Sequence, residues 1–241
     1  MNTSDTGWPL DIKTHSWVED TENQVDFILQ TLALTGKERI LDLACGFGRH
    51  SLSLARRGFS VVGVDYTNVY IEDAVQSAQA SGLTAEFVHA DVLDVRYDSE
   101  FDVVLNLADG AIGYFQDDRD NLKLFDVIAR ALKPGGQHLM DVCNAEHAER
   151  FFPKRHWEIG TKRVSLPEFD WDPDRRRMLF TDWSIPFGEI AVRPETIEKD
   201  QDGVRLYTEA ELAAILNERH MRVVRTFSNY YGKPATPGSS S

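Results

Sequence analysis

The residues whose types and spacing could do chemistry are concentrated in one segment, Asp42-Leu43-Ala44-Cys45-Gly46-Phe47-Gly48-Arg49-His50. Gly46 and Gly48 permit a tight turn and a close approach of the backbone to a ligand. A helix that begins just beyond them offers unpaired N–H groups to a carboxylate. A dinucleotide fingerprint needs a third glycine at position 51, which is Ser51, and the Gly-Lys-Ser/Thr of a P-loop is absent. The glycine pair alone is also compatible with a simple tight turn.

Two acidic residues extend this pattern. Asp65 follows an apolar run, where a carboxylate can accept hydrogen bonds from two ribose hydroxyls. Asp91 follows the next run, where its side chain can accept from an adenine amino group. Either residue taken alone is compatible with a solvated loop or a helix cap. Three such features at the ends of three consecutive strands favour a site for a nucleotide-like ligand.

The elements that must position these residues alternate between strands and helices. Apolar runs predict strands at 39–43, 60–64, 85–89, 101–105 and 137–142. Helical periodicity and glycine stops predict helices at 19–34, 50–57, 69–81 and 121–132. This order is typical of a doubly wound, Rossmann-like α/β fold, with a mainly parallel sheet covered on both faces.

The alternation stops after Asn144. Aromatic and β-like stretches at 162–166, 178–185 and 189–192 predict an antiparallel insert. A helix then begins at Thr208, with Glu211 at capping-box spacing. We therefore expect five parts: a lid segment (1–18), a cofactor-binding core (19–145), the insert (146–200), a last helix with a strand at 222–228 (201–232), and a flexible tail (233–241).

These motifs resemble those of the class I S-adenosylmethionine-dependent methyltransferases, most closely the small-molecule branch with a DLxCGxGRH motif. The resemblance covers roughly residues 19–231 and implies a strand order of 3-2-1-4-5, with further strands beyond the fifth. It implies S-adenosylmethionine as cofactor and an insert that helps to cover the substrate. The cofactor-binding residues expected on this basis are Trp17, Asp42, Ala44, Gly46, Gly48, His50, Asp65, Tyr66, Asp91, Val92 and Asn106.

The sequence departs from the family pattern in two places. Ala44 stands where the family often has glycine, which should matter little if its φ is negative. The family normally ends in a seventh, antiparallel strand between the fifth and sixth strands. Here only Lys-Pro-Ala-Thr-Pro-Gly-Ser-Ser-Ser follows Gly232, so we expect either a shortened chain or a differently built sheet edge.

The residues expected to handle the methyl acceptor are Asp109, Tyr114 and His147. Each has an alternative: Asp109 as a turn cap, Tyr114 as loop packing and His147 as a surface histidine. For Trp17, the alternative to cofactor binding is packing on the surface. For His50, it is packing inside the first helical turn. The insert's aromatic residues form either an acceptor pocket or the hydrophobic underside of a small sheet.

The composition narrows the choice of partners. The chain has 26 Lys and Arg against 39 Asp and Glu, a formal net charge of −13, which disfavours binding to a phosphate backbone. Two cysteines, no signal peptide and no membrane-length apolar run favour a cytoplasmic protein. No histidine pair has metal-ligand spacing, so we expect no metal.

We expect a small-molecule acceptor; the alternatives are an RNA methyltransferase and a non-catalytic S-adenosylmethionine-binding module. The oligomeric state stays open.

Overall fold

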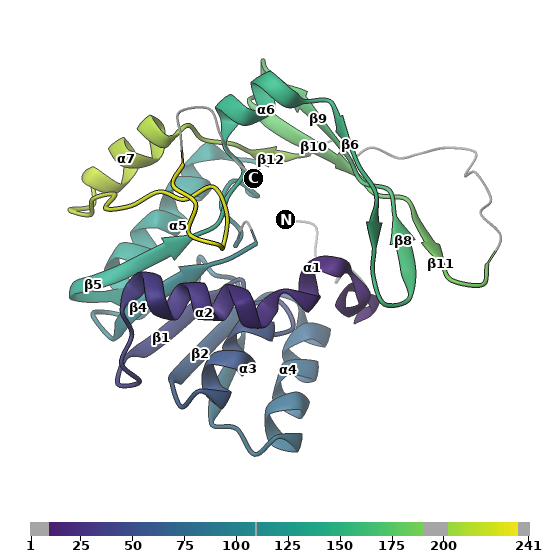
Figure 1. Ribbon diagram of the computed structural model, residues 1–241. Helices are drawn as coiled ribbons and strands as arrows, with labels where there is room; N and C mark the ends of the chain where they lie inside the picture. Colours follow the sequence, from purple (N-terminus) through teal and green to yellow (C-terminus); the bar gives the residue numbers. More distant parts are fainter. Residues whose placement is uncertain (1–9, 109, 190–201, 236–241) are drawn as a thin grey trace.

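The molecule is organised around a parallel β-sheet whose strands alternate along the chain with helices (Figure 1). The computed structural model describes residues 10–108, 110–189 and 202–235. Its central strands are β1 (Arg39–Leu43), β2 (Ser60–Asp65), β3 (Ala85–His89), β4 (Phe101–Asn106) and β5 (Leu132–Met140). They lie in the order β3-β2-β1-β4-β5, and every pairing is parallel. The predicted fold class and strand order are confirmed.

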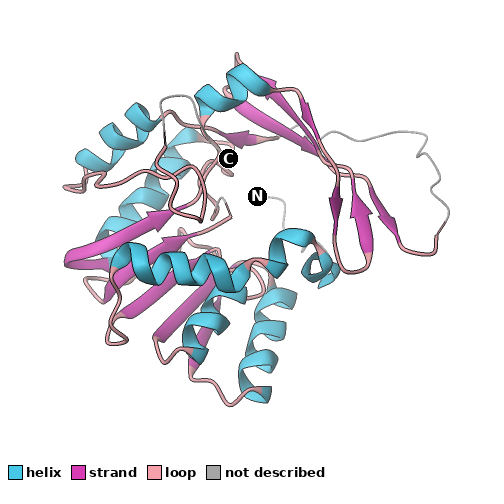
Figure 2. Cartoon of the chain, in the orientation of Figure 1, coloured by secondary structure: helices cyan, strands magenta, loops and turns pink. Residues whose placement is uncertain are grey.

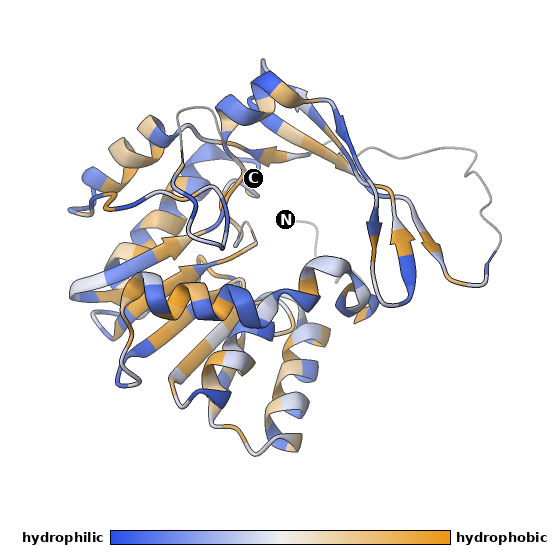
Figure 3. Cartoon of the chain, in the orientation of Figure 1, coloured by the Kyte–Doolittle hydropathy of each residue, from blue (hydrophilic) through white to orange (hydrophobic). Residues whose placement is uncertain are grey.

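Helices cover both faces of this sheet (Figure 2). Neighbouring side chains of β1 point to opposite faces: Ile40 packs with α2 and α3, and Leu41 packs with α5 and α7. Burial on both faces explains the apolar strand interiors, which are orange in Figure 3. The helices are η1 (Leu10–Thr14), α1 (Ser16–Glu19), α2 (Thr21–Leu32), α3 (Arg49–Arg56), α4 (Asn68–Ala80), α5 (Asp118–Ala131), α6 (Ala145–Phe151) and α7 (Glu209–Asn217).

After β5 the chain forms two small antiparallel sheets, which confirms the predicted insert. One has the order β12-β10-β9-β6 and the other β11-β8-β7. In Figure 1 they arch over the side toward which the core strands point. Their strands are β6 (Lys154–Arg155), β7 (Glu158–Ile159), β8 (Arg163–Ser165), β9 (Glu168–Asp172), β10 (Arg177–Thr181), β11 (Ser184–Pro186) and β12 (Val204–Arg205).

The insert differs from the prediction in its details. The stretch 178–185 contains two strands of different sheets, because the chain turns at Asp182, whose side chain accepts a hydrogen bond from Ser184. Val204 pairs with Met178, so the four-stranded sheet includes residues beyond the predicted boundary at 200. Of the predicted stretch 189–192, only Glu189 lies among the described residues.

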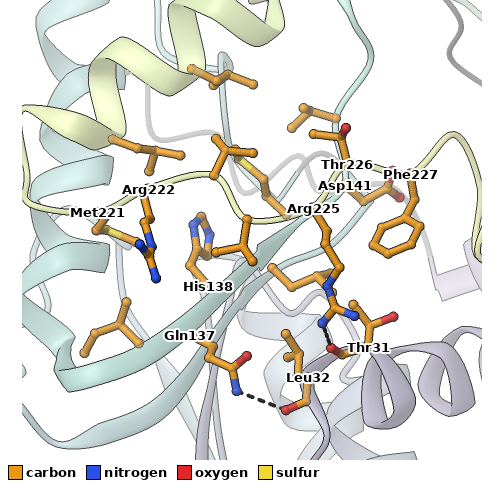
Figure 4. Close-up of a pocket in the computed structure, with 18 of the residues that line it drawn as sticks. Thr31, Leu32, Gln137, His138, Asp141, Met221, Arg222, Arg225, Thr226 and Phe227 are labelled. Atoms are coloured by element: carbon orange, nitrogen blue, oxygen red, sulfur yellow. Dashed lines mark hydrogen bonds between the residues drawn. The ribbon is translucent and has the colours of Figure 1, made fainter. Parts of the chain in front are cut away.

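In the C-terminal part, the predicted helix is present but the predicted strand is not. Thr208 and Glu211 form the expected capping box of α7. The predicted strand at 222–228 is wrong, because in this segment only Phe227 makes a bridge, to Pro234. The segment passes the outer edge of β5 across a cavity of about 770 Å³ (Figure 4). Side chains from both sides line this cavity, and no strand pairs with the outer edge of β5 in the described ranges.

Candidate functional site

The turn between β1 and α3 places the glycine motif at the carboxyl end of the sheet. Gly46 and Gly48 both have left-handed backbones, with φ of 55° and 74°. A Cβ on Gly48 would lie 2.7 Å from Cε1 of Phe87, whereas a Cβ on Gly46 would meet nothing within 4 Å. Gly48 is therefore required by packing, and Gly46 leaves open space beside the turn for a ligand.

Ala44 was expected to matter little only if its φ were negative, and this condition is not met. Its φ is 58° rather than negative, a conformation that costs an L-residue about 1–2 kcal/mol. Hydrogen bonds on either side fix the turn: Cys45 N donates to Val64 O at 3.0 Å, and Gly48 N donates to Cys45 O at 3.0 Å. The turn thus keeps its shape although Ala44 carries a side chain.

Asp65 lies beside the glycine turn. Its carboxylate accepts a hydrogen bond from Gly46 N at 2.8 Å through Oδ2, and another from Thr67 N at 2.8 Å through Oδ1. The side chain is only 5% exposed. Each carboxylate oxygen can accept a further hydrogen bond. Asp65 can therefore brace the turn and still receive hydroxyl groups of a ligand.

Asp42 lies below the same turn and is 2% exposed. Its Oδ2 accepts a hydrogen bond from Ser51 Oγ at 2.6 Å, which joins β1 to α3. Burial raises the pKa of this carboxyl to about 6, against the opposing effects of Ser51 and Arg49. Asp42 is thus placed to orient the turn from beneath.

The first turn of α3 is held against α2. Arg49 Nη1 donates to Thr21 Oγ1 at 2.9 Å and to Gln24 Oε1 at 2.5 Å. His50 Nε2 lies 2.8 Å from the same Gln24 oxygen. The His50 side chain is 4% exposed, and burial places its pKa well below the usual value. This geometry favours the packing alternative for His50. Trp17 covers Arg49, whose guanidinium carbon lies 5.0 Å from the ring centre.

The predicted adenine-side residues lie at the ends of β2 and β3. Asp91 accepts a hydrogen bond from Leu93 N at 2.9 Å and remains partly exposed. The Val92 side chain packs in the core below. Tyr66 is 54% exposed, and its backbone oxygen lies 2.8 Å from His89 Nε2. Asp91 and Tyr66 are therefore accessible, whereas Val92 could meet a ligand only through its backbone.

A second polar group forms where β4 and β5 end. Asn106 is fully buried; its Nδ2 donates to Gly110 O at 2.7 Å, and its Oδ1 lies 3.1 Å from His138 Nε2. Asp141 N donates to Asn106 O at 2.9 Å, and Asp141 Oδ2 accepts from Tyr230 Oη at 2.8 Å. Burial raises the pKa of Asp141 and lowers that of His138 to about 4. The Asn106 side chain thus orders the following loop.

Residues 40–136 match the model of the family described as the methyltransferase domain. Over these residues the chain is similar to methyltransferase domains. The match runs from β1 to the start of β5, so it includes the glycine turn, Asp65, Asp91 and Asn106.

Relatives that the chain matches differ in the acceptors that their names give. The glycine/sarcosine N-methyltransferase of Aphanothece halophytica is 28% identical over 176 residues, 70% of this chain and 66% of that protein. The ubiquinone biosynthesis O-methyltransferase of Roseobacter denitrificans is 33% identical over 129 residues, 48% of this chain and 50% of that protein. The chain spans about half the length of several curated relatives that it matches.

Solved structures share the fold over nearly the whole chain. An S-adenosylmethionine-dependent methyltransferase from Clostridium acetobutylicum superposes with a TM-score of 0.73 at 18% identity, covering 92% of this chain and 89% of that one. The sugar N-methyltransferase KedS8 from Streptoalloteichus superposes with a TM-score of 0.68 at 18% identity, covering 98% and 95%. The likeness in fold therefore extends beyond residues 40–136 into the insert.

Two of the three residues predicted to handle the acceptor can be described, and they lie in different elements. Asp109 lies outside the described residues. Tyr114, in the loop after β4, is 47% exposed. His147 is 9% exposed in α6 and packs 4.6 Å, between ring centres, from Phe151. Burial, and then Lys154, lowers the pKa of His147. The alternative of a surface histidine is thus wrong, and a structural role in the insert fits the packing better than catalysis.

Sequence reasoning missed the Asp141–Tyr230 pair. Asp141 directly follows β5, but the strand predicted at 137–142 placed it inside the strand, so the strand-end rule passed over it. Tyr230 is reached only through tertiary contact, 89 residues away. Within the described ranges there is no cluster of three metal-binding side chains, and none of the helices there is long and apolar enough to cross a membrane.

Proposed function

We propose that this chain is an S-adenosylmethionine-dependent methyltransferase that moves a methyl group to an N, O or C nucleophile of a small molecule. The observation that carries the proposal is the sheet edge where Asp65 braces the open turn at Gly46, within the segment that matches the methyltransferase domain. Relatives named for glycine/sarcosine, ubiquinone and sugar acceptors support a small-molecule acceptor.

The residues at this edge fit the donor. Asp65 has acceptor capacity for ribose hydroxyls, and Asp91 is partly exposed on the adenine side. The open space beside Gly46 leaves room for the chain that links ribose to sulfur. When bound, S-adenosylmethionine supplies an electrophilic methyl group on a sulfonium.

The protein's own contribution is to position the two reactants and to exclude water. Effective positioning of an acceptor lone pair in line with the methyl group is worth about 7–11 kcal/mol. The loop after β4 is ordered by Asn106 and carries the exposed Tyr114. We propose Tyr114, together with Asp109, for contact with the acceptor, and assign His147 to packing.

The aromatic residues of the insert divide into two groups. Phe169 and Trp171 pack against the small core formed with α6. Trp157 and Phe187 are 66% and 53% exposed. The first pair serves the underside of the sheet, and we propose the second pair as apolar surface for the acceptor.

The proposal is tested by calorimetric titration with S-adenosylhomocysteine, the demethylated donor. The wild-type protein is expected to bind, and Asp65→Ala is expected to bind at least tenfold more weakly, because ribose hydroxyls lose their acceptor. Wild-type affinity in Asp65→Ala would remove the basis of the assignment.

Two alternatives make different predictions. A 23S rRNA methyltransferase of Pseudomonas aeruginosa is 46% identical over 72 residues, but these cover only 16% of that protein. An RNA acceptor would require binding that weakens steeply with salt, which a chain of net charge −13 disfavours. A non-catalytic module would bind S-adenosylhomocysteine and transfer no labelled methyl group to any small-molecule acceptor.

A further inference from the structure

The first turn of α3 carries a cation without a carboxylate partner. Arg49 donates only to the neutral oxygens of Thr21 and Gln24 and lies against the Trp17 ring. Within the part of the chain that the structure describes, no Asp or Glu lies in ion-pairing distance of its guanidinium. Burial lowers the pKa of Arg49 to about 10. Because buried charges are normally paired, Arg49 has unused capacity for an anion.

Carboxyl groups lie around this cation at longer range. Asp42, Asp141 and Asp20 act to raise the pKa of Arg49, against the larger effect of burial. Asp42 is covered by Ser51 and almost fully buried. Asp141 is partly exposed at the carboxyl end of β5, and its carboxylate accepts hydrogen bonds from Tyr230 Oη and from the backbone of Ala108. Asp141 is therefore the carboxylate best placed to receive a cationic group of a ligand.

We propose, resting on the function above, that Arg49 binds the α-carboxylate and Asp141 binds the α-ammonium of the amino-acid end of the methyl donor. This end of the donor has one carboxylate, one ammonium and one sulfonium. The single guanidinium of Arg49 complements the carboxylate, and the carboxyl groups around it complement the two positive charges. Arg49 begins α3, whose first N–H groups add further attraction for an anion. Gln24 is a positioning residue, because His50 and Arg49 share its side-chain oxygen.

This arrangement also gives Trp17 a role. Its ring covers the guanidinium and shields it from water, which strengthens a charge-assisted hydrogen bond to a carboxylate. The planar fork of arginine suits bidentate contact with a carboxylate. In this proposal Trp17, predicted to bind the cofactor, is a positioning residue that acts through Arg49.

The test compares two ligands that differ only in this end of the molecule. S-adenosylhomocysteine carries the amino-acid group, and 5′-methylthioadenosine has the adenosine and sulfur without it. Calorimetry gives the ratio of their dissociation constants for wild type, Arg49→Met and Asp141→Asn. Both variants are expected to lose at least tenfold in affinity for S-adenosylhomocysteine, and to bind 5′-methylthioadenosine within about twofold of wild type. Asp65→Asn is the matched control and should weaken both ligands equally.

Three results would overturn the proposal. The first is S-adenosylhomocysteine binding within threefold of wild type in Arg49→Met. The second is an equal loss of both ligands in that variant, which would indicate a purely structural residue. The third is an unchanged ratio of dissociation constants in Asp141→Asn. If Arg49→Met does not fold, Arg49→Lys provides the same test. It keeps the charge but loses the planar fork, so its loss of affinity for S-adenosylhomocysteine is expected to exceed its loss for 5′-methylthioadenosine, and equal losses would overturn the proposal. A wild-type protein that binds neither ligand contradicts the proposed function instead.

Discussion

The two glycines of the turn allow stability to be separated from ligand binding. Gly46 and Gly48 both have left-handed backbones, so alanine at either position costs about 1–2 kcal/mol. At Gly48 the new Cβ would also meet Phe87 Cε1 at 2.7 Å and Ala74 Cβ at 3.1 Å, and overpacking of this kind adds about 1–3 kcal/mol. We therefore expect Gly48→Ala to lower the free energy of unfolding by about 2–5 kcal/mol and Gly46→Ala by about 1–2 kcal/mol.

The ligand affinities should follow the opposite order: the loss of affinity should be larger for Gly46→Ala than for Gly48→Ala. Gly46→Ala fills open space beside the turn, so we expect a loss of at least about tenfold in S-adenosylhomocysteine affinity in a protein that still folds. Urea unfolding measures the stabilities and calorimetry the affinities. The double variant Gly48→Ala/Phe87→Leu should recover about 1 kcal/mol, because the ring that collides is removed. Equal destabilisation by the two single variants would refute the role given to Phe87.

Three further predictions concern the same edge of the sheet. Ala44→Gly should raise the free energy of unfolding by about 0.5–1 kcal/mol, because it relieves a positive φ; a lower urea midpoint would contradict this. Burial raises the pKa of Asp42 to about 6 from 3.8, so the native protein holds a proton that the unfolded chain releases between these values. Stability should therefore fall as pH rises through this window, by up to ~3 kcal/mol, and Asp42→Asn should flatten the profile. Gln24→Leu should weaken S-adenosylhomocysteine binding while 5′-methylthioadenosine binding stays unchanged, and equal effects on both ligands would assign Gln24 to folding alone.

The core could be predicted because its signals are local. The strand at 39–43 has the predicted bounds, and Thr208 with Glu211 forms the predicted capping box. Strand interiors buried on both faces are continuously apolar, and the glycines that follow them mark the turns. Asp65 could be placed for the same reason, since all parallel strands end at one edge of the sheet.

The parts that were missed depend on distant contacts. The segment 222–228 has the composition of a strand, but in the described ranges it joins no sheet and its end pairs only with residues 233–235, and a sequence does not show which partner is present. The positive φ of Ala44 is imposed by hydrogen bonds of the turn rather than by alanine itself. The burial of His147 depends on aromatic rings of the insert, one of which, that of Phe152, lies 6.1 Å away. Local pattern carries no information on such contacts.

The N-terminal segment joins the two halves of the molecule, and this gives the predicted lid a physical basis. Lys13 pairs with Asp73 of α4 and lies over the ring of Phe47 in the glycine turn. On the other side, Thr161 N donates to Thr14 O at 2.9 Å, and Arg163 pairs with Asp11. The segment therefore contacts the insert and the cofactor edge at once.

Gly160 is the position at which this contact can be broken without touching the core. A Cβ at Gly160 would collide with Thr14 O, although the backbone of Gly160 is not in the left-handed region. We expect Gly160→Ala to displace the segment and to raise the dissociation rate of S-adenosylhomocysteine at least about threefold, with little change in core stability. Stopped-flow fluorescence measures that rate. Gly188→Ala is the control in the insert: its φ of 85° strains an alanine, but its Cβ would meet nothing within 4 Å, so it perturbs the insert without a collision with the N-terminal segment. A dissociation rate that is the same in both variants would show that the segment does not retain the ligand.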